Sequence, residues 1–166
     1  MHWGGAGDPE NPPRVGAPLQ GTDKAGSAGG LGGGPVTLLD THAWVWLVAG
    51  PKRLSARARR HIDSEMRGGP LLVSSMSVWE VAMLGERGRL VLTIGVEDWV
   101  AHCEALPFLS FVPVSNRIAL ESVRLPAFPS PDPADRIIVA TALGLGATVV
   151  TADRRLHTYS RIRTVW

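Results

Sequence analysis

From Val36 onward, short aliphatic runs alternate with longer segments whose apolar residues recur at helical spacing. The expected strands are VTLL, LLVS, LSFVPV, TVVT and RTVW, at residues 36–39, 71–74, 109–114, 148–151 and 163–166. The expected helices lie at 41–49, 55–67, 76–86, 96–106, 115–123 and 134–144. Short strands that are apolar throughout are typical of sheets covered on both faces. The pattern therefore predicts an α/β sandwich, in which helices flank a parallel sheet.

Two of these helices carry clear start and stop signals. Ser55 is placed to cap the helix over 55–67. Asp132 is placed as the N-cap of the helix over 134–144, with Pro133 at its first position and Asp135 at its third. Glycines 144 and 146 follow at its far end, where a helix commonly stops.

Residues 1–35 differ from the rest of the chain. They contain 11 Gly and 5 Pro and show no hydrophobic periodicity, so they are expected to be disordered, and residues 36–166 are expected to form the single domain. They have no basic start followed by an apolar stretch of signal-peptide length, and no apolar run in the chain approaches the roughly 18 residues of a membrane span. With only one cysteine, Cys103, which is expected to be a buried packing residue, the sequence favours a cytoplasmic protein.

The charge balance gives weak support for a nucleic-acid partner. Residues 36–166 carry 15 Lys and Arg against 12 Asp and Glu, and 14 of the 15 cations are arginine. Arginine suits two-pronged phosphate contacts. Arginine richness can equally reflect the base composition of a genome, so both readings stay open.

Four acidic residues occupy positions that favour a shared site. Asp40 follows the first strand directly, and Asp153 follows the strand over 148–151 after one residue. Parallel strands deliver the residues after their carboxyl ends to one edge of the sheet, which is where ligands bind. Glu80 lies within an apolar helical stripe, and Asp135 lies in a first helical turn on an apolar face. The sequence therefore predicts four carboxylates with few basic partners at helical spacing.

Four such carboxylates repel one another unless a cation lies between them. Oxygen ligands without a His or Cys cluster suit Mg²⁺ or Mn²⁺ and disfavour zinc. The chemistry that this permits is metal-assisted hydrolysis of a phosphodiester. In that scheme Asp40 and Asp135 are direct ligands, while Glu80 and Asp153 position water or a second ion.

Each acid also has a purely structural interpretation. Asp40 would cap the helix that follows it, and Asp153 would begin the turn in TADRRL. Asp135 would share helix capping with Asp132, and Glu80 would pair with an arginine from the next turn. Only the joint placement of the four acids argues for a metal centre.

Other polar and aromatic residues are expected to matter less for chemistry. Four histidines lack ligand spacing and are assigned to surface or packing roles: His42, His61, His102 and His157. Trp44 and Trp46 are two residues apart on one helix, so both cannot face one core. Their spacing suggests that one of them faces a partner protein.

With these residues in place, the chain resembles the PIN-domain ribonucleases, specifically the VapC-type toxins of type II toxin–antitoxin pairs. The matching stretches, in the order of the family, are LLDTHAWVWL, LSARARRHID, VSSMSVWEVAML with GRLVL, DPADRIIVATAL and VVTADRRL, followed by a Tyr and a final VW. They cover essentially residues 36–166. In this resemblance the acidic quartet of the family falls on Asp40, Glu80, Asp135 and Asp153.

The resemblance implies a three-layer α/β/α sandwich and Mg²⁺- or Mn²⁺-dependent cleavage of RNA. It also implies a homodimer and inhibition by a cognate VapB-type antitoxin. Two positions depart from the family pattern, since Leu84 stands where relatives often have lysine and Ala134 where they often have an aromatic residue. The first departure argues against a basic RNA contact from that helix, and the second concerns packing more than chemistry.

Two other functions are weighed beside the toxin. A phosphotransfer or haloacid-dehalogenase-like domain also has an acid after its first strand, but it typically needs a second acid two residues on, where this chain has His42. A catalytically silent PIN-like module would serve in interaction or regulation, but such a module has usually lost one or more of the four acids. The nuclease therefore remains the leading interpretation.

Overall fold

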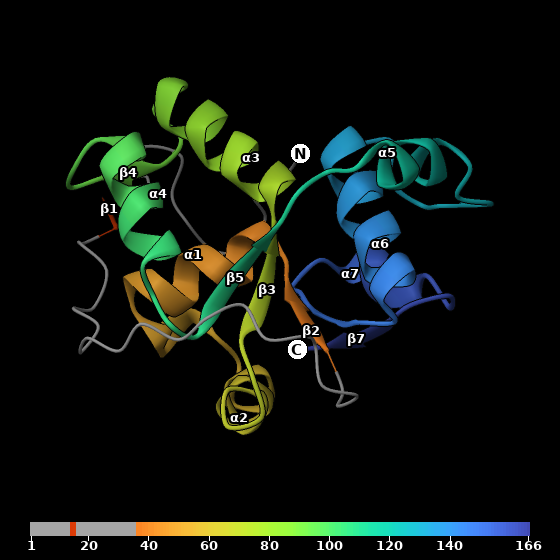
Figure 1. The fold of residues 1–166 in the computed structure, drawn as a ribbon, viewed down its shortest axis with the longest axis horizontal. Coiled ribbons are helices and arrows are strands. Elements are labelled where there is room, and N and C mark those ends of the chain that lie inside the picture. Colours follow the sequence, from red (N-terminus) through yellow and green to blue (C-terminus); the bar gives the residue numbers. More distant parts are fainter. Residues whose placement is uncertain (1–13, 16–35) are drawn as a thin grey trace.

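The computed structural model describes residues 14–15 and 36–166, and the second range folds around a five-stranded sheet (Figure 1). The strands of this sheet are β2 Thr37–Leu39, β3 Leu71–Ser74, β5 Leu109–Val112, β6 Thr148–Val150 and β7 Arg163–Val165. Their order is β5-β3-β2-β6-β7, and all neighbours are parallel. Each strand lies within one of the five apolar runs, so the expected sheet is confirmed.

The six expected helices are present, with ends within two residues of the expected ones. They are α1 Thr41–Ala49, α2 Ala56–Glu65, α3 Ser75–Glu86, α4 Val96–Glu104, α5 Asn116–Val123 and α6 Pro133–Leu145. Two short helices are additional, η1 Pro51–Arg53 and α7 Arg154–Thr158. The segment TADRRL thus begins a helix, where its sequence suggests a turn.

The capping signals read from the sequence are used as expected. The Ser55 side chain accepts a hydrogen bond from the backbone N–H of Ala58, and Asp132 accepts one from Ala134. At the other end of α6, Gly146 takes a left-handed conformation with φ of 63°. Because glycine lacks a Cβ, it adopts this conformation without steric cost and ends the helix.

The order in which the chain adds strands to the sheet reverses at the central strand β2. It runs from β2 outward to β3 and β5, and then returns to β6 and β7 on the other side of β2. The connections after β2 and β6 leave toward opposite faces, so these two strands form a switch point, and ligands of open α/β sheets bind outside the carboxyl ends of the strands at such a point. Asp40 and Asp153 follow these two strands.

Alternate residues of the central strands build two separate cores, because successive side chains in a strand point to opposite faces. Leu39 and Val73 belong to the larger core, together with residues of α1, α2, α3 and α4. Leu38 and Leu72 belong to a second core with Ile138 of α6. Figure 1 shows α1–α4 on one side of the sheet and α5–α7 on the other, which is the three-layer α/β/α sandwich.

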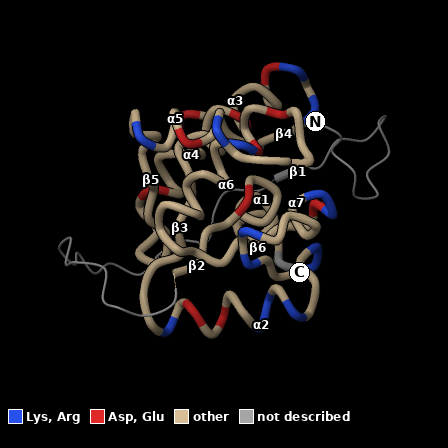
Figure 2. The backbone as a smooth tube through the Cα atoms, turned by 90° about the vertical axis from the view of Figure 1, so that its right-hand side faces the viewer, with Lys and Arg blue, Asp and Glu red and all other residues tan. Residues whose placement is uncertain are grey.

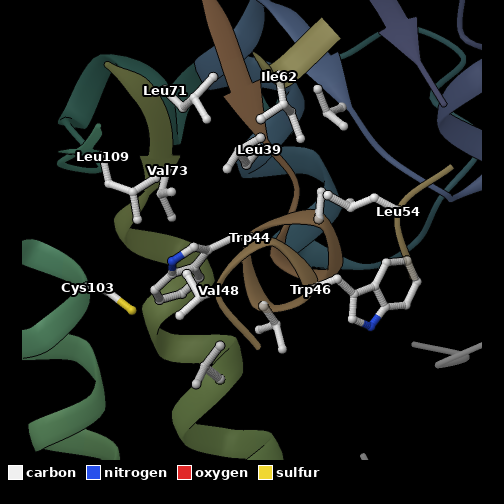
Figure 3. Packing of buried hydrophobic residues seen from close by; sticks show 14 of the residues in the cluster. Leu39, Trp44, Trp46, Val48, Leu54, Ile62, Leu71, Val73, Cys103 and Leu109 are labelled. Atoms are coloured by element: carbon white, nitrogen blue, oxygen red, sulfur yellow. The ribbon is translucent and has the colours of Figure 1, made fainter. Parts of the chain in front are cut away.

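Trp44 and Trp46 are both buried, so the prediction that one faces a partner is wrong. The two rings leave α1 in opposite directions (Figure 3). Trp44 packs against Trp99 and Phe111, with ring centroids 4.8 and 5.4 Å away. Trp46 packs against Trp166 at the carboxyl end of the chain, 5.5 Å away. Helix α1 is covered on both sides, a consequence of tertiary packing that its own sequence does not reveal.

Three further positions prove to be packing residues. Cys103 is buried in the larger core, and burial raises the pKa of its thiol to about 12, which confirms the expected structural role. Leu84 is also buried in this core, so a lysine at this position would have to leave it. Ala134 is buried in the first turn of α6, where it contributes to packing as expected.

The N-terminal segment contributes one described element. Residues Arg14–Val15 form β1, which runs parallel to β4 Val91–Leu92. The disorder expected for the rest of residues 1–35 falls outside the described residues. Within the described part of the chain, no helix is both long and apolar enough to cross a membrane.

Candidate metal centre

Asp40 lies at the carboxyl end of β2 and caps α1 with its side chain. One carboxylate oxygen accepts a hydrogen bond from the backbone N–H of Thr41 at 2.7 Å, and the other accepts one from the Thr151 hydroxyl at 2.7 Å. Burial alone would raise the pKa of Asp40, but the interaction with His42 and the bond from Thr151 outweigh it and lower the pKa. This carboxylate is therefore ionised, with both oxygens fixed in direction. The capping role and a metal-binding role are compatible, because each oxygen keeps a second lone pair.

Glu80 is fully buried on α3, although its sequence neighbourhood offers arginines in the following turn. Its Oε2 accepts a hydrogen bond from the Thr41 hydroxyl at 2.7 Å. The Thr41 and Ser77 hydroxyl oxygens are 2.9 Å apart, and since Thr41 has one hydroxyl proton, Ser77 donates to Thr41. The Oε1 of Glu80 is buried and has no hydrogen-bond partner in the described part of the chain. An acidic oxygen in this state is suited to a cation.

Burial, together with the nearby charges of Asp40 and Asp135, raises the pKa of Glu80 to about 8, although the hydrogen bond from Thr41 opposes this rise. Without a cation, Glu80 in the folded protein therefore keeps its proton up to about pH 8, whereas in the unfolded chain it releases the proton near pH 4.5. The free energy of unfolding is therefore not reduced by Glu80 below pH 4.5, and it falls as the pH rises toward 8, because ionisation of Glu80 then favours the unfolded chain.

Glu80→Gln is expected to remove the loss of stability that ionisation of Glu80 causes at high pH. In EDTA at pH 8, the variant should be more stable than the wild type by about 1–3 kcal/mol, and the difference should shrink at pH 5.5, because Gln does not titrate. Urea unfolding at both pH values measures the effect. Glu104→Gln, on the exposed surface of α4, is the matched control and should show no such pH-dependent gain. Equal pH dependence in the Glu80→Gln variant and the wild type would contradict this account.

Asp135 lies in the first turn of α6, where the helix dipole favours an anion. It is buried, and its Oδ2 accepts a short hydrogen bond from the Ser130 hydroxyl. Burial raises the pKa of Asp135 to about 6, with the charge of Asp40 acting in the same direction and Ser130 opposing it. Its side chain bonds Ser130 rather than sharing the helix cap with Asp132, whose own side chain caps α6.

Asp153 caps α7, so the structural role foreseen for it is present. Its Oδ1 accepts from the backbone N–H of Arg155 at 2.8 Å, and the Arg155 guanidinium contacts both carboxylate oxygens. Burial would raise the pKa of Asp153, but the hydrogen bonds and charge of Arg155 lower it. The same guanidinium lies 3.4 Å from Asp135 Oδ2. Among the described residues, Asp153 is thus the acid of the four with the closest basic partner.

His42 belongs to this site, and the surface or packing role expected for it is incomplete. Its Nδ1 lies 3.6 Å from Asp40 Oδ2. Burial would lower the pKa of His42, but the charges of Asp40, Glu80 and Asp135 raise it, so the ring interacts electrostatically with three of the acids. Its position two residues after Asp40 is the signal in the sequence that points to this role.

The four acids form two linked pairs at the switch point of the sheet. Thr41 joins Asp40 to Glu80, and Arg155 joins Asp135 to Asp153. The charges of Asp40 and Asp135 raise the pKa of Glu80, and the charge of Asp40 raises that of Asp135, so the two pairs lie close enough for their charges to interact. Among residues 14–15 and 36–166, however, no three His, Cys, Asp or Glu side chains form a ready-made metal-binding group. The donors fit a hard divalent ion in chemistry, and binding one requires side-chain movement or bridging water.

Sequence reasoning missed four residues that hold these acids: Thr41, Ser130, Thr151 and Arg155. Three of them contact an acid that is at least five residues away in the chain, so no local pattern reveals the contact. Arg155 is only two residues from Asp153, but its contact with Asp135 spans 20 residues. Their common signal is the placement of hydroxyl residues and one arginine at strand and helix ends.

Comparison with known proteins yields consistent matches. The PIN domain family model matches residues 37–162. The chain is 38% identical over 131 residues to Ribonuclease VapC22 of Mycobacterium tuberculosis, covering 78% of this chain and 97% of that protein.

Solved structures share the fold at much lower identity. The DNA-bound VapBC from Salmonella typhimurium matches with a TM-score of 0.57 and 18% identity, over 78% of this chain and 96% of that chain. VapBC2 from Rickettsia felis, bound to a fragment of its promoter, has a TM-score of 0.57 and 13% identity over the same shares of the two chains. At these identities the structures support the common fold alone.

Proposed function

The chain belongs to the PIN-domain family, and from that premise we propose that it is a divalent-metal-dependent endoribonuclease. It acts as the toxin of a type II toxin–antitoxin pair and hydrolyses RNA phosphodiester bonds. The observation that carries this proposal is the set of three buried, mutually interacting carboxylates, Asp40, Glu80 and Asp135, at the switch point of the sheet. The identity to Ribonuclease VapC22 over nearly its whole length supports the same activity.

The metal would be held by oxygen ligands. Asp40 and Asp135 are the direct ligands in this proposal, and Glu80 and Asp153 position water or a second ion. When bound there, the ion would supply an activated water molecule and positive charge for the phosphate. Mg²⁺ and Mn²⁺ both suit this ligand set. The unpartnered Oε1 of Glu80 supports the presence of a cation near this oxygen.

The neighbouring side chains of the protein fix the acids before any ion arrives. Thr151 and the backbone N–H of Thr41 orient Asp40, while the Thr41 hydroxyl orients Glu80. These hydrogen bonds occupy one lone pair on each bonded oxygen and leave the other available. A site that is oriented in advance reorganises less during the reaction, which favours catalysis.

The proposal includes two protein partners. A VapB-type antitoxin would inhibit the nuclease, and RNA as the substrate implies action in the cytoplasm. A homodimer is also part of the proposal, and exposed apolar side chains on α3 and α5 support a protein contact there: Trp79, Leu120 and Val123.

The alternative is a catalytically silent PIN-like module that serves in interaction or regulation. Retention of all four acids favours the enzyme, because a silent module has no need for three buried carboxylates. A buried carboxylate costs free energy unless a cation or hydrogen bonds compensate for it.

Incubation of antitoxin-free protein with structured RNA tests the proposal. With Mg²⁺ or Mn²⁺ the RNA should be cut, and EDTA should reduce the rate at least about 100-fold, because the carboxylates would then lack the ion that activates water. Gel analysis of the products measures the rate, and adding excess Mg²⁺ back should restore it. Equal cleavage in EDTA would reject the metal mechanism, whereas absence of cleavage of every RNA tested would favour the silent module.

A further inference from the structure

Arg155 joins two acids that come from different segments of the chain. Its guanidinium contacts both oxygens of Asp153 and lies 3.4 Å from Asp135 Oδ2. Asp135 is on α6 and Asp153 precedes α7, so the arginine bridges the starts of two helices. Figure 2 shows basic and acidic residues next to each other at α7. The arginine therefore supplies positive charge to one side of the acidic site.

The geometry fixes Arg155 in this place. Its backbone N–H donates to the Asp153 side chain that caps α7, so its Cα lies beside that carboxylate. Its Nε donates to Oδ1 and its Nη2 donates to Oδ2 of this carboxylate, which is the forked arrangement that guanidinium and carboxylate groups prefer. The side chain is 38% exposed, so it can leave the acids by rotating toward solvent.

A guanidinium at this position opposes a divalent ion in two ways. It occupies carboxylate oxygens that the proposed metal site uses, and its positive charge repels the divalent ion at close range. Of the two proposed direct ligands, Asp135 is the one affected, because its Oδ2 already accepts from Ser130 and is shared with Arg155. An ion that binds Asp135 must therefore compete with this arginine.

We propose that Arg155 is an internal counter-ion of the acidic site, which holds Asp135 and Asp153 in the metal-free protein and must be displaced when a divalent ion binds. The inference rests on the proposed metal site and assigns to Arg155 a positioning role within it. Arg155 keeps the acids ordered and their repulsion low without metal, at the expense of metal affinity. Removing its charge therefore tightens metal binding.

Mn²⁺ titration by calorimetry at pH 8 tests this inference. This pH lies about two units above the pKa of about 6 that Asp135 has in the wild type, so its carboxylate is ionised there. Arg155→Gln removes the charge and is expected to tighten Mn²⁺ binding about 5- to 10-fold, as expected for one partly exposed charge at short range. Arg155→Lys keeps the charge but loses the fork, and it should tighten binding two- to threefold.

Arg154→Gln is the matched control. Arg154 is the exposed neighbour on α7, so its variant has the same change in net charge and should bind Mn²⁺ within twofold of the wild type. Equal tightening by Arg154→Gln would show a general charge effect and overturn the inference. Unchanged or weaker binding in the Arg155 variants would also overturn it.

The outcomes separate this inference from the proposed function. If the wild type binds Mn²⁺ and Asp40→Asn does not, the metal site stands, and the Arg155 variants decide the inference alone. If neither the wild type nor any variant binds Mn²⁺ in a saturable way, the metal site and the inference are both rejected. Should Arg155→Gln fail to fold by circular dichroism, Arg155→Lys still decides the outcome.

Discussion

Asp40→Asn is expected to lower the rate of metal-dependent RNA cleavage by at least about 1,000-fold. Asp40 is a direct metal ligand in the proposed site, and the variant loses the negative charge that attracts the ion. Loss of one group that stabilises charge in a transition state typically costs a rate factor on the order of 10²–10³, and loss of metal affinity adds to this. Asp135→Asn should have an effect of similar size.

The fold should survive this substitution, so the loss can be assigned to chemistry. Asn is as good a helix N-cap as Asp, and its amide oxygen can still accept the bond from the backbone N–H of Thr41. The amide group can face the Thr151 hydroxyl, which then accepts instead of donating. Circular dichroism and the urea midpoint should therefore stay near those of the wild type.

Asp63→Asn is the matched control for the activity measurement. Asp63 is exposed on α2 and its substitution makes the same change in charge, so cleavage should remain within twofold of the wild type. Cleavage rates are measured at a Mn²⁺ concentration that saturates the wild type and at ten times that concentration. The higher concentration partly rescues a variant whose defect is weak metal binding. Full activity of both Asp40→Asn and Asp135→Asn would reject the proposed site.

Trp44→Ala is expected to destabilise the protein by about 3–5 kcal/mol, the range for truncation of a large buried aromatic residue. Trp44 is fully buried and contacts Trp99 of α4 and Phe111 of β5. It thereby ties α1 to two other elements of the larger core. The substitution removes both ring contacts and leaves a cavity among α1, α4 and β5.

Urea unfolding followed by circular dichroism measures this loss. Trp79→Ala is the control, because Trp79 is 54% exposed on α3 and its truncation should cost less than about 1 kcal/mol. If Trp44→Ala does not fold, Trp44→Phe retains part of the ring contacts and should cost about 1–3 kcal/mol. A cost below 1 kcal/mol for both Trp44 variants would contradict the packing described here.

The sequence contains enough information to predict the architecture. Five apolar runs predicted the five strands of the sheet, and helical spacing with capping residues such as Ser55 and Asp132 located the six long helices. These signals are local, since a strand buried on both faces must be apolar throughout and a helix end must satisfy its own N–H groups. The five-residue helix α7 was missed because its local sequence is equally suited to a turn.

The sequence also identified which acids deserve attention. Asp40 and Asp153 were selected because residues after parallel strands share one edge of the sheet, and both lie at the switch point. Glu80 and Asp135 were selected as acids on apolar faces, and both are buried. Placement at a strand end or on a helical face is a property of the chain, so one sequence is enough to reveal it.

Only the tertiary structure decided how these acids are held. The contacts Thr41–Glu80 and Thr151–Asp40 join segments that are 39 and 111 residues apart, and the link from Arg155 to Asp135 crosses two helices. The burial of both Trp44 and Trp46 likewise depends on Trp99 and Trp166, which come from distant segments. Hydrogen bonds and ring contacts act over a few ångströms, and which groups come that close is set by the packing of the layers. The pattern of the chain therefore determined the layers and the candidate acids, and the packing determined their partners.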